Sequence, residues 1–389
     1  MIKQRLITRN VLALPALLVL CGCATIEDFL DTLRREQAAP IAPLAERPVV
    51  KPVLPNHFVL GSAEQSVIGV PQIVFTRDAD TLSDLARTYG LGYDELIAAN
   101  PGIDPWLPGT KTPVLLPTQY VVPDVPREGV VLNIASKRLF YFPEVPEGQP
   151  QVVKTYPIGI GRVGWETPLG TTKVVAKARD PHWYVPASVR REHRELGDPL
   201  PAVVPPGPDN PLGTHVLKLE MPGYLIHGTN QPYGVGMRVS HGCVRLYPEN
   251  IEFLYELVEI GETVTIINEP FLLGQLNGDT FFEGHSPLED DVISADERLE
   301  TLLETHAEHI TTGFAKGDKD HVRAIASVAN GVPALIARHD ADEVLARAQV
   351  VENIVEDNPD APTLSEVREM IDEANREADL AQEADAEQM

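Results

Sequence analysis

Short apolar runs separated by turn residues fill residues 128–268, and this pattern constrains the fold more than any other feature. The runs are rich in β-branched and aromatic residues, whereas only Pro248 to Val258 has a helical pattern there. Many short strands with few helices are typical of antiparallel sandwiches and barrels. We therefore expect a mainly β domain, an antiparallel β-sandwich or barrel. The expected strands are Val130–Ile134, Arg138–Phe142, Val152–Tyr156, Thr172–Val175, Val216–Leu219, Tyr224–Ile226 and Val264–Ile267.

Residues 72–118 precede this domain and have a different pattern, strand, helix, helix, strand. This βααβ order, with the letters DTLSDLARTYGLGYDELIAANPGI, resembles a lysin motif (LysM), a small module that binds the N-acetylglucosamine backbone of glycans. The alternative is a packing module that does not bind sugar. The expected elements are a strand at Ile73–Phe75, a helix beginning after Asp80 or Thr81, a helix over Tyr93–Ala99, and a strand at Val114–Pro117.

The first 23 residues have the pattern of a bacterial lipoprotein signal peptide. Three positive residues precede the apolar stretch Val11–Leu20, which is too short to span a membrane. The letters LCGCA at 20–24 resemble a lipobox, which predicts acylation of Cys23. Residues 24–57 are rich in proline and predict a semi-rigid linker. We expect a periplasmic protein held by lipid to the outer membrane of a Gram-negative bacterium; cleavage without lipidation is the alternative.

Residues 291–389 are strongly acidic. They contain 24 acidic and 8 basic residues and so carry −16 of the chain's net charge of −25. Apolar residues such as Leu299, Leu302 and Leu303 recur at helical spacing. We expect an α-helical acidic region that fades after Glu377 into a disordered tail. The negative charge of the chain argues against nucleic acid as a partner, because binding phosphates requires basic patches.

The segment Ser-His-Gly-Cys-Val-Arg at 240–245 carries the candidate chemistry. Of the 3 cysteines, Cys21 would leave with the signal peptide and Cys23 would be acylated, so Cys243 is the only free thiol. In an extended chain residues two apart project to the same side, so we expect His241 and Cys243 to face one another. An imidazole beside a thiol takes its proton and produces a nucleophilic thiolate. His241 is therefore the candidate general base.

Neighbouring residues complete the predicted pocket. His227 ends the preceding strand and is expected to reach the same site. Gly242 has no side chain, so its backbone can approach a substrate and direct an amide at an oxyanion. Arg245 adds a fixed positive charge on the same face. Two alternatives stay open: Cys243 as a small buried hydrophobe, and a zinc site formed by His227, His241 and Cys243.

The residues His-Gly-Thr at 227–229, followed by a glycine-rich loop and 240–245, resemble the active-site signature of the L,D-transpeptidases, which have a YkuD-type catalytic domain. The resemblance extends over 128–268 and favours the Gram-negative, ErfK/YbiS-like subgroup, in which a LysM-like module precedes the catalytic domain. It implies that Cys243 attacks the diaminopimelate carbonyl of a tetrapeptide stem and releases D-Ala, with His241 as general base. A backbone carbonyl would orient that base. The remaining pocket and oxyanion residues implied are His227, Gly228, Ser240, Gly242 and Arg245.

The acceptor of this reaction is left open by the sequence. A diaminopimelate amine of a second stem would give a 3–3 crosslink, the lysine of a lipoprotein would give a tether, and water would make the enzyme an L,D-carboxypeptidase. The chemistry requires no cofactor and no metal. The alternative from another class is a non-catalytic lipoprotein that binds peptidoglycan through its LysM-like module.

Overall fold

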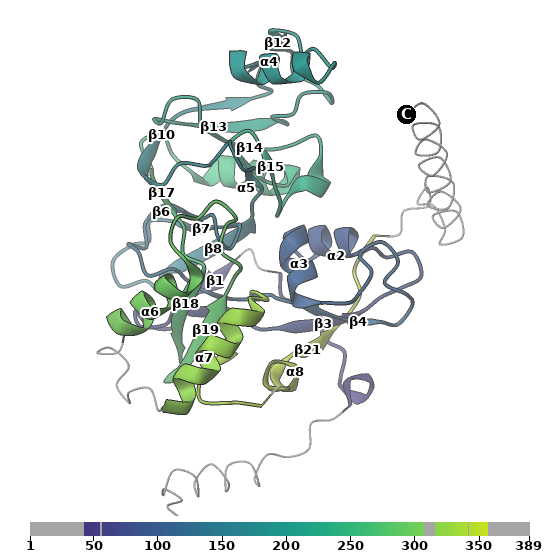
Figure 1. Cartoon of the computed structure of the whole chain (residues 1–389), viewed down its shortest axis with the longest axis vertical. Helices are drawn as coiled ribbons and strands as arrows, with labels where there is room; N and C mark the ends of the chain where they lie inside the picture. The colour runs from purple at the N-terminus through teal and green to yellow at the C-terminus, as the bar shows by residue number, and fades with distance from the viewer. Residues whose placement is uncertain (1–42, 55–56, 307–315, 341, 357–389) are drawn as a thin grey trace, which may run out of the picture. The chain divides into compact units, whose positions relative to one another are not determined.

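A nine-stranded, mixed and curled sheet is the central element of the structure (Figure 1). The computed structural model describes residues 43–54, 57–306, 316–340 and 342–356. In spatial order the strands are β1 (Phe58–Val59), β8 (Val152–Pro157), β7 (Arg138–Phe142), β6 (Gly129–Asn133), β17 (Thr263–Ile267), β10 (Gly170–Arg179), β13 (His215–Leu219), β14 (Leu225–His227) and β16 (Val244–Arg245).

The strand predictions are confirmed, but the pairing differs from an antiparallel sandwich. All seven predicted strands are present, and β10 extends beyond its predicted end to Arg179. β6 pairs with β17 in parallel, and β14 pairs with β16 in parallel. β10 pairs with β17 through its first residues and with β13 through its last, so one long strand serves both halves of the sheet. Six of the eight pairings in the sheet are antiparallel, in line with the mainly antiparallel domain that we expected. The two parallel pairs were not predicted, because an apolar run does not encode its partner.

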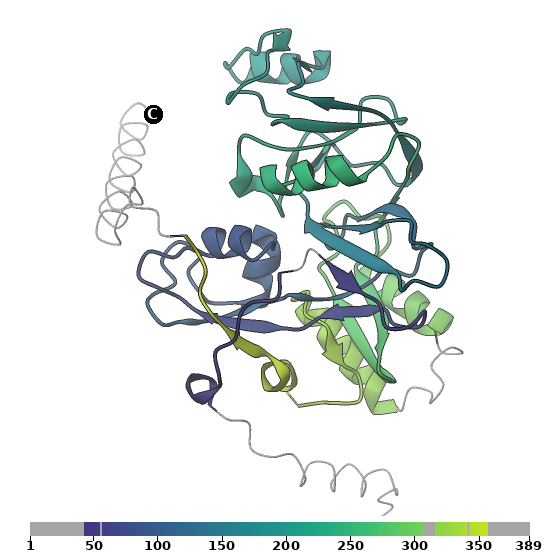
Figure 2. The same ribbon diagram turned by 180° about the vertical axis from the view of Figure 1, so that it is seen from behind.

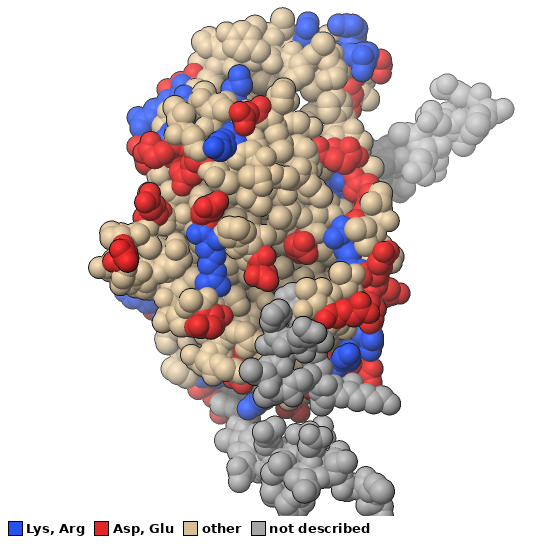
Figure 3. Space-filling model, turned by 90° about the vertical axis from the view of Figure 1, so that its left-hand side faces the viewer, with Lys and Arg blue, Asp and Glu red and all other residues tan. Residues whose placement is uncertain are grey.

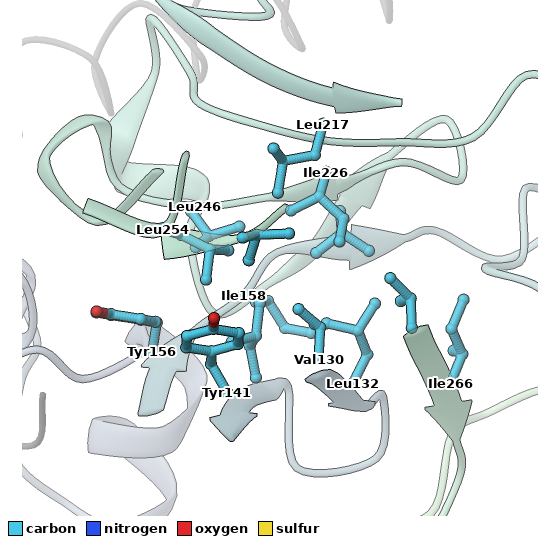
Figure 4. Packing of buried hydrophobic residues seen from close by; sticks show 14 of the residues in the cluster. Val130, Leu132, Tyr141, Tyr156, Ile158, Leu217, Ile226, Leu246, Leu254 and Ile266 are labelled. Carbon is cyan, nitrogen blue, oxygen red and sulfur yellow. The ribbon is translucent and has the colours of Figure 1, made fainter. Parts of the chain in front are cut away.

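The central strands β6 and β7 are buried on both faces. Val130 and Leu132 belong to one hydrophobic core, together with Leu254 of helix α5 (Pro248–Leu257), as Figure 4 shows. Val131 and Phe140 point to the other side and belong to a second core, shared with residues 60–122. Strands covered on both faces lose the alternation of polar and apolar residues, which explains the continuous apolar runs in the sequence.

The expected βααβ elements before the main sheet are present. Thr81 caps the first helix, and its hydroxyl accepts a hydrogen bond from the Asp84 amide. The two helices lie side by side in both views (Figures 1 and 2). The elements are β3 (Gln72–Phe75), α2 (Leu82–Thr88), α3 (Tyr93–Ala99) and β4 (Pro113–Leu116), with β3 antiparallel to β4, and a separate pair of strands, β2 (Val67–Gly69) and β5 (Gln119–Val121), flanks them.

A buried ion pair joins this module to the main sheet. Arg138 of β7 donates to the Glu95 carboxylate of α3 at 2.6 Å, and both side chains are almost fully enclosed. The guanidinium also stacks over the Tyr120 ring, 4.0 Å from its centroid. The βααβ module is therefore packed onto the domain and is not merely tethered to it.

Residues 50–53 of the expected proline-rich linker are bound to neighbouring strands. The Val50 amide donates to the Val350 carbonyl, and the Val53 amide donates to the Gln72 side chain. Residues 50–53 therefore do not act as a free spacer, since both contacts bind them to neighbouring strands. Residues 43–46 include a short 3-10 turn, η1 (Leu44–Glu46). The predicted signal peptide and Cys23 lie outside the described residues.

The C-terminal region contains the expected helices, but it is not purely helical. One strand, β20, extends the hairpin of β18 and β19, and β21 adds in parallel to β3 of the module. Short strands whose partners lie far away in sequence give no signal of their own. The elements are β18 (Phe271–Leu276), β19 (Asp279–Gly284), α6 (Ala295–His306), α7 (Lys316–Val328), β20 (Ala334–Leu335), α8 (Glu343–Arg347) and β21 (Gln349–Val351).

Charge is dispersed on the surface, and the predicted acidic tail after Glu377 lies outside the described residues. Figure 3 shows acidic and basic side chains interspersed with large uncharged areas on one face. No helix within the described ranges is both long enough and apolar enough to cross a membrane.

An insertion between β10 and β13, residues 180–214, contains a second helix of the catalytic region; we call this insertion the flap. Helix α4 (Ala187–Glu195) was missed by the sequence analysis, because Val189 is its only buried residue and the apolar periodicity is weak. The paired strands β11 (Trp183–Tyr184) and β12 (Val203–Val204) complete the flap. Three more short elements, β9 (Ile160–Gly161), η2 (Pro232–Gly234) and β15 (Arg238–Ser240), border the site described next.

Candidate active site

Three predicted site residues lie together at the edge of the main sheet, on strands β14 and β16. His227 and Arg245 are register partners in this parallel pair. Residues directly opposite in a sheet, and residues two apart along one strand, project to the same face. Cys243 lies two residues before Arg245, immediately ahead of β16, so all three belong to one face. The backbone of Arg245 also exchanges two hydrogen bonds with Gly159, at 2.8 and 2.9 Å, which fixes the strand from its other side.

A tight turn over 240–243 presents the thiol. The Ser240 hydroxyl donates to the Cys243 carbonyl at 2.5 Å and accepts from the Gly242 amide at 3.2 Å. Thr167 fixes the same turn by donating to the Gly242 carbonyl at 3.1 Å. Gly242 has a φ of +98°, a conformation that residues with a side chain rarely adopt. The chain is thus not extended through Gly242, and the argument that placed His241 opposite Cys243 does not hold there.

Cys243 is a free, partly buried thiol. Its Sγ lies 3.7 Å from the Gly223 carbonyl oxygen. Burial raises the pKa of the thiol, while the Leu225 backbone and the positive charge of Arg245 act in the opposite direction. The resting group is therefore the neutral thiol, and a base must take its proton before it can act as a nucleophile.

His227 is buried, with 3% of its surface exposed. Its Nδ1 lies 2.6 Å from the Gly228 carbonyl oxygen. Because a carbonyl only accepts, Nδ1 carries the proton and Nε2 is left as an acceptor. Burial, and secondly the charge of Arg245, lower the pKa of His227 to about 3, so the ring is neutral near pH 7. A backbone carbonyl does orient an imidazole in this site, but it is His227 and not His241.

His241 has different partners from those predicted. Its Nε2 lies 2.9 Å from a carboxylate oxygen of Glu192 and 3.2 Å from Nη2 of Arg162. Glu192 and Arg162 also form an ion pair with each other. The Trp165 ring meets the imidazole edge-on, with centroids 4.8 Å apart. No hydrogen bond joins His241 to Cys243 in the described structure, so the contact that a general base at His241 would make to the thiol is not seen there.

The environment of His241 acts in both directions on its protonation. Burial lowers the pKa of the imidazole, and the charges of Arg162 and His193 lower it further, whereas the hydrogen-bonded carboxylate of Glu192 opposes them. Glu192 belongs to α4 of the flap and is 49 residues from His241 in sequence. Residues 224–247 contain no Asp or Glu, so the sequence around the site did not predict this carboxylate, which comes from the flap.

The zinc alternative has no support from the side-chain arrangement. Across the described ranges, no three or more His, Cys, Asp or Glu side chains gather in a way that could hold a metal ion. His227, His241 and Cys243 therefore do not form the three-ligand set that the sequence left open.

The site thus presents a cysteine, a buried histidine and an arginine on one face at the edge of a mainly β domain. The family model described as the L,D-transpeptidase catalytic domain matches residues 127–266. The protein named Probable L,D-transpeptidase YcfS of Escherichia coli K12 is 37% identical over 294 residues, which cover 74% of this chain and 90% of that protein. The chain belongs to the L,D-transpeptidase family.

Two further relatives match a shorter part of the chain. Probable L,D-transpeptidase YbiS of Escherichia coli K12 is 42% identical over 226 residues, covering 57% of this chain and 72% of that protein. Probable L,D-transpeptidase ErfK/SrfK of Salmonella typhimurium LT2 is 40% identical over 223 residues, covering 57% of this chain and 69% of that protein. The predicted subgroup is thereby confirmed.

Proposed function

We propose that this protein is a peptidoglycan L,D-transpeptidase in which Cys243 is the nucleophile. The observation that carries the proposal is the common face of Cys243, His227 and Arg245 on β14 and β16, in a chain of this family. The donor is a tetrapeptide stem, and the bond that breaks joins diaminopimelate to the terminal D-Ala.

The structure supports His227 as the general base more strongly than His241, which the sequence favoured. His227 shares a sheet face with Cys243, and its Nδ1 donates to the Gly228 carbonyl, so Nε2 is the nitrogen that would accept the thiol proton. The Leu212 backbone also interacts with this ring. Nε2 of His241 is already engaged by Glu192 and Arg162. We therefore assign His241 to the wall of the site, where it holds the flap.

The reaction has two halves. His227 takes the thiol proton, and Sγ of Cys243 attacks the diaminopimelate carbonyl. The tetrahedral intermediate collapses with cleavage of the C–N bond, and the imidazolium returns its proton to the departing D-Ala amine. An acceptor amine then attacks the thioester, a new amide forms, and the thiol is regenerated.

The oxyanion of this intermediate needs N–H donors. The Gly242 amide already donates to Ser240, whereas the Cys243 amide has no acceptor within the described part of the chain. The Cys243 amide is therefore the oxyanion donor in our proposal, in place of an amide at Gly242. Gly228 contributes the carbonyl that holds the base.

The remaining modules extend the proposal to the cell envelope. The βααβ module, with its LysM-like sequence, would bind the glycan strand, and its firm packing on β7 through Arg138 would keep that strand near the sheet. Lipid attached to Cys23 would anchor the protein in the periplasm at the outer membrane. Both proposals rest on sequence patterns. The partners are then peptidoglycan, the membrane and, for one acceptor, a lipoprotein.

The test is incubation of the purified protein with tetrapeptide muropeptides, read by mass spectrometry beside Cys243→Ala, His227→Ala and His241→Ala. We expect dimers that have lost one D-Ala, absent for Cys243→Ala and His227→Ala and reduced for His241→Ala. Tripeptide monomers alone would identify water or an absent lipoprotein lysine as the acceptor. Unchanged tetrapeptide with the folded wild-type protein would refute the proposal in favour of a binding-only lipoprotein. Loss of product in His241→Ala but not in His227→Ala would reverse our choice of base.

A further inference from the structure

The guanidinium of Arg245 is a charged group to which the reaction above gives no task. Its side chain is partly buried, and its Nε is fully enclosed without a hydrogen-bond partner. No ion pair or hydrogen bond of this side chain occurs among the residues that the structure describes. Burial lowers the pKa of the group, as expected for a cation that is removed from water without a counter-ion.

Arg138 provides the contrast within the same protein. Its buried guanidinium is met by the Glu95 carboxylate at 2.6 Å and by the face of the Tyr120 ring. A buried charge is normally compensated in this way, because an unpaired one is costly. Arg245 is only partly buried and has no counter-ion among the residues that the structure describes, so its solvent-exposed Nη groups are available to an anion that enters the site.

The position of Arg245 indicates which anion. It stands two residues after Cys243 on the same face, a separation of roughly 6.6 Å at about 3.3 Å per strand residue. Its backbone is bound on one side by β14 and on the other by Gly159, so the side chain cannot leave through a shift of the strand. The charge acts on both Cys243 and His227, which places it beside the reacting groups.

We propose that Arg245 forms a subsite for the free carboxylate of the amino acid that the reaction releases. This inference rests on the proposed function. In the donor stem, the carboxylate of the terminal D-Ala lies one residue beyond the scissile carbonyl of diaminopimelate, about 3.8 Å further along the peptide. A carbonyl in contact with Sγ therefore brings that carboxylate within reach of the guanidinium. The subsite selects a stem that ends directly after the scissile bond, because a longer stem would present an uncharged amide there.

The test compares two substrates in each preparation of the full-length protein: a tetrapeptide stem with a free terminal carboxylate and the same stem as its terminal amide. Initial rates at equal, low concentration report kcat/KM for release of D-Ala and of D-alaninamide. For the wild type we expect the free acid to react about 10- to 100-fold faster, the range for a charge-assisted hydrogen bond. In Arg245→Met we expect this ratio to fall to about one, whatever the change in the rate that both substrates share.

The ratio is taken within one preparation, so partial unfolding of Arg245→Met does not affect it. Arg245→Lys should keep part of the preference, and Arg179→Met, the same change at an exposed site of β10, should keep all of it. If the wild type releases D-Ala and D-alaninamide at nearly equal rates, the proposed carboxylate subsite is refuted. Equal slowing of both substrates in Arg245→Met overturns it too, since the charge would then act on the thiolate or the oxyanion. Turnover of neither substrate by the wild type would refute the proposed function itself.

Discussion

Replacing Glu95 by alanine should destabilise the protein strongly, because it leaves the Arg138 guanidinium buried without a counter-charge. Breaking one side of a buried ion pair costs about 3–5 kcal/mol. Glu95 also accepts a hydrogen bond from the Gly92 amide at 2.9 Å and so caps α3, which adds about 1 kcal/mol. The Tyr120 ring still faces the cation and offsets part of the loss. We expect a net loss of about 3–4 kcal/mol in the free energy of unfolding.

The assay is urea-induced unfolding followed by far-ultraviolet circular dichroism. Asp94→Ala is the matched control, since Asp94 is the neighbouring residue and pairs with Lys137 at the surface at 3.2 Å, where such pairs contribute about 0–1 kcal/mol. The double variant Glu95→Leu with Arg138→Leu removes both charges and should recover most of the stability. A cost of Glu95→Ala no larger than that of Asp94→Ala, or a double variant no more stable than the single one, would refute this account.

Two further predictions concern the site. Glu192→Gln should lower the pKa of His241, because the carboxylate opposes the effects of burial and of Arg162. A nuclear magnetic resonance titration of the His241 ring measures this pKa, with Glu195→Gln on the same helix as the control. An unchanged pKa in Glu192→Gln would contradict the prediction. Gly242→Ala should cost about 1–2 kcal/mol, because φ is +98° and the new Cβ would meet the Tyr224 ring at 3.1 Å. Gly242→Ala should also displace the Cys243 amide and abolish turnover. Thermal unfolding measures the loss of stability, and the muropeptide assay measures the loss of turnover. A fully active variant would refute this account of the turn.

Local patterns predicted the elements of this fold, whereas the partners of those elements were hidden. The strand–helix–helix–strand order of 72–118 followed from caps and breakers, which act within a few residues. The apolar run of β6 predicted a strand but not its two cores, since Val130 and Val131 differ only in the side to which they point. The parallel partner of β6 is β17, far along the chain, and nothing in either run identifies the other.

For the candidate site too, the sequence predicted some features and could not predict others. Cys243 and His227 could be found from the sequence because the chemistry of a thiol and an imidazole is visible in residue type and in their position at strand ends. The choice between two histidines could not be made, because it depends on which ring nitrogen is held. A carbonyl one residue away holds His227, and a carboxylate from the flap holds His241. His241 and Cys243 were expected to face one another as in an extended chain, but the chain is not extended at Gly242, whose φ only the structure reveals.

Charged side chains join the flap to the residues around the catalytic turn. Glu192 binds both Arg162 and His241, so the flap is held to the body by one carboxylate shared between two partners. An arriving stem peptide carries carboxylates and an amine of its own, which compete for the same three groups. Under the proposed function, such a peptide would exchange contacts with this cluster, whereas Arg245 has no side-chain ion pair to lose within the described structure. Under the proposed function, these contacts would therefore influence substrate entry, and Arg245 would influence which chain end is accepted.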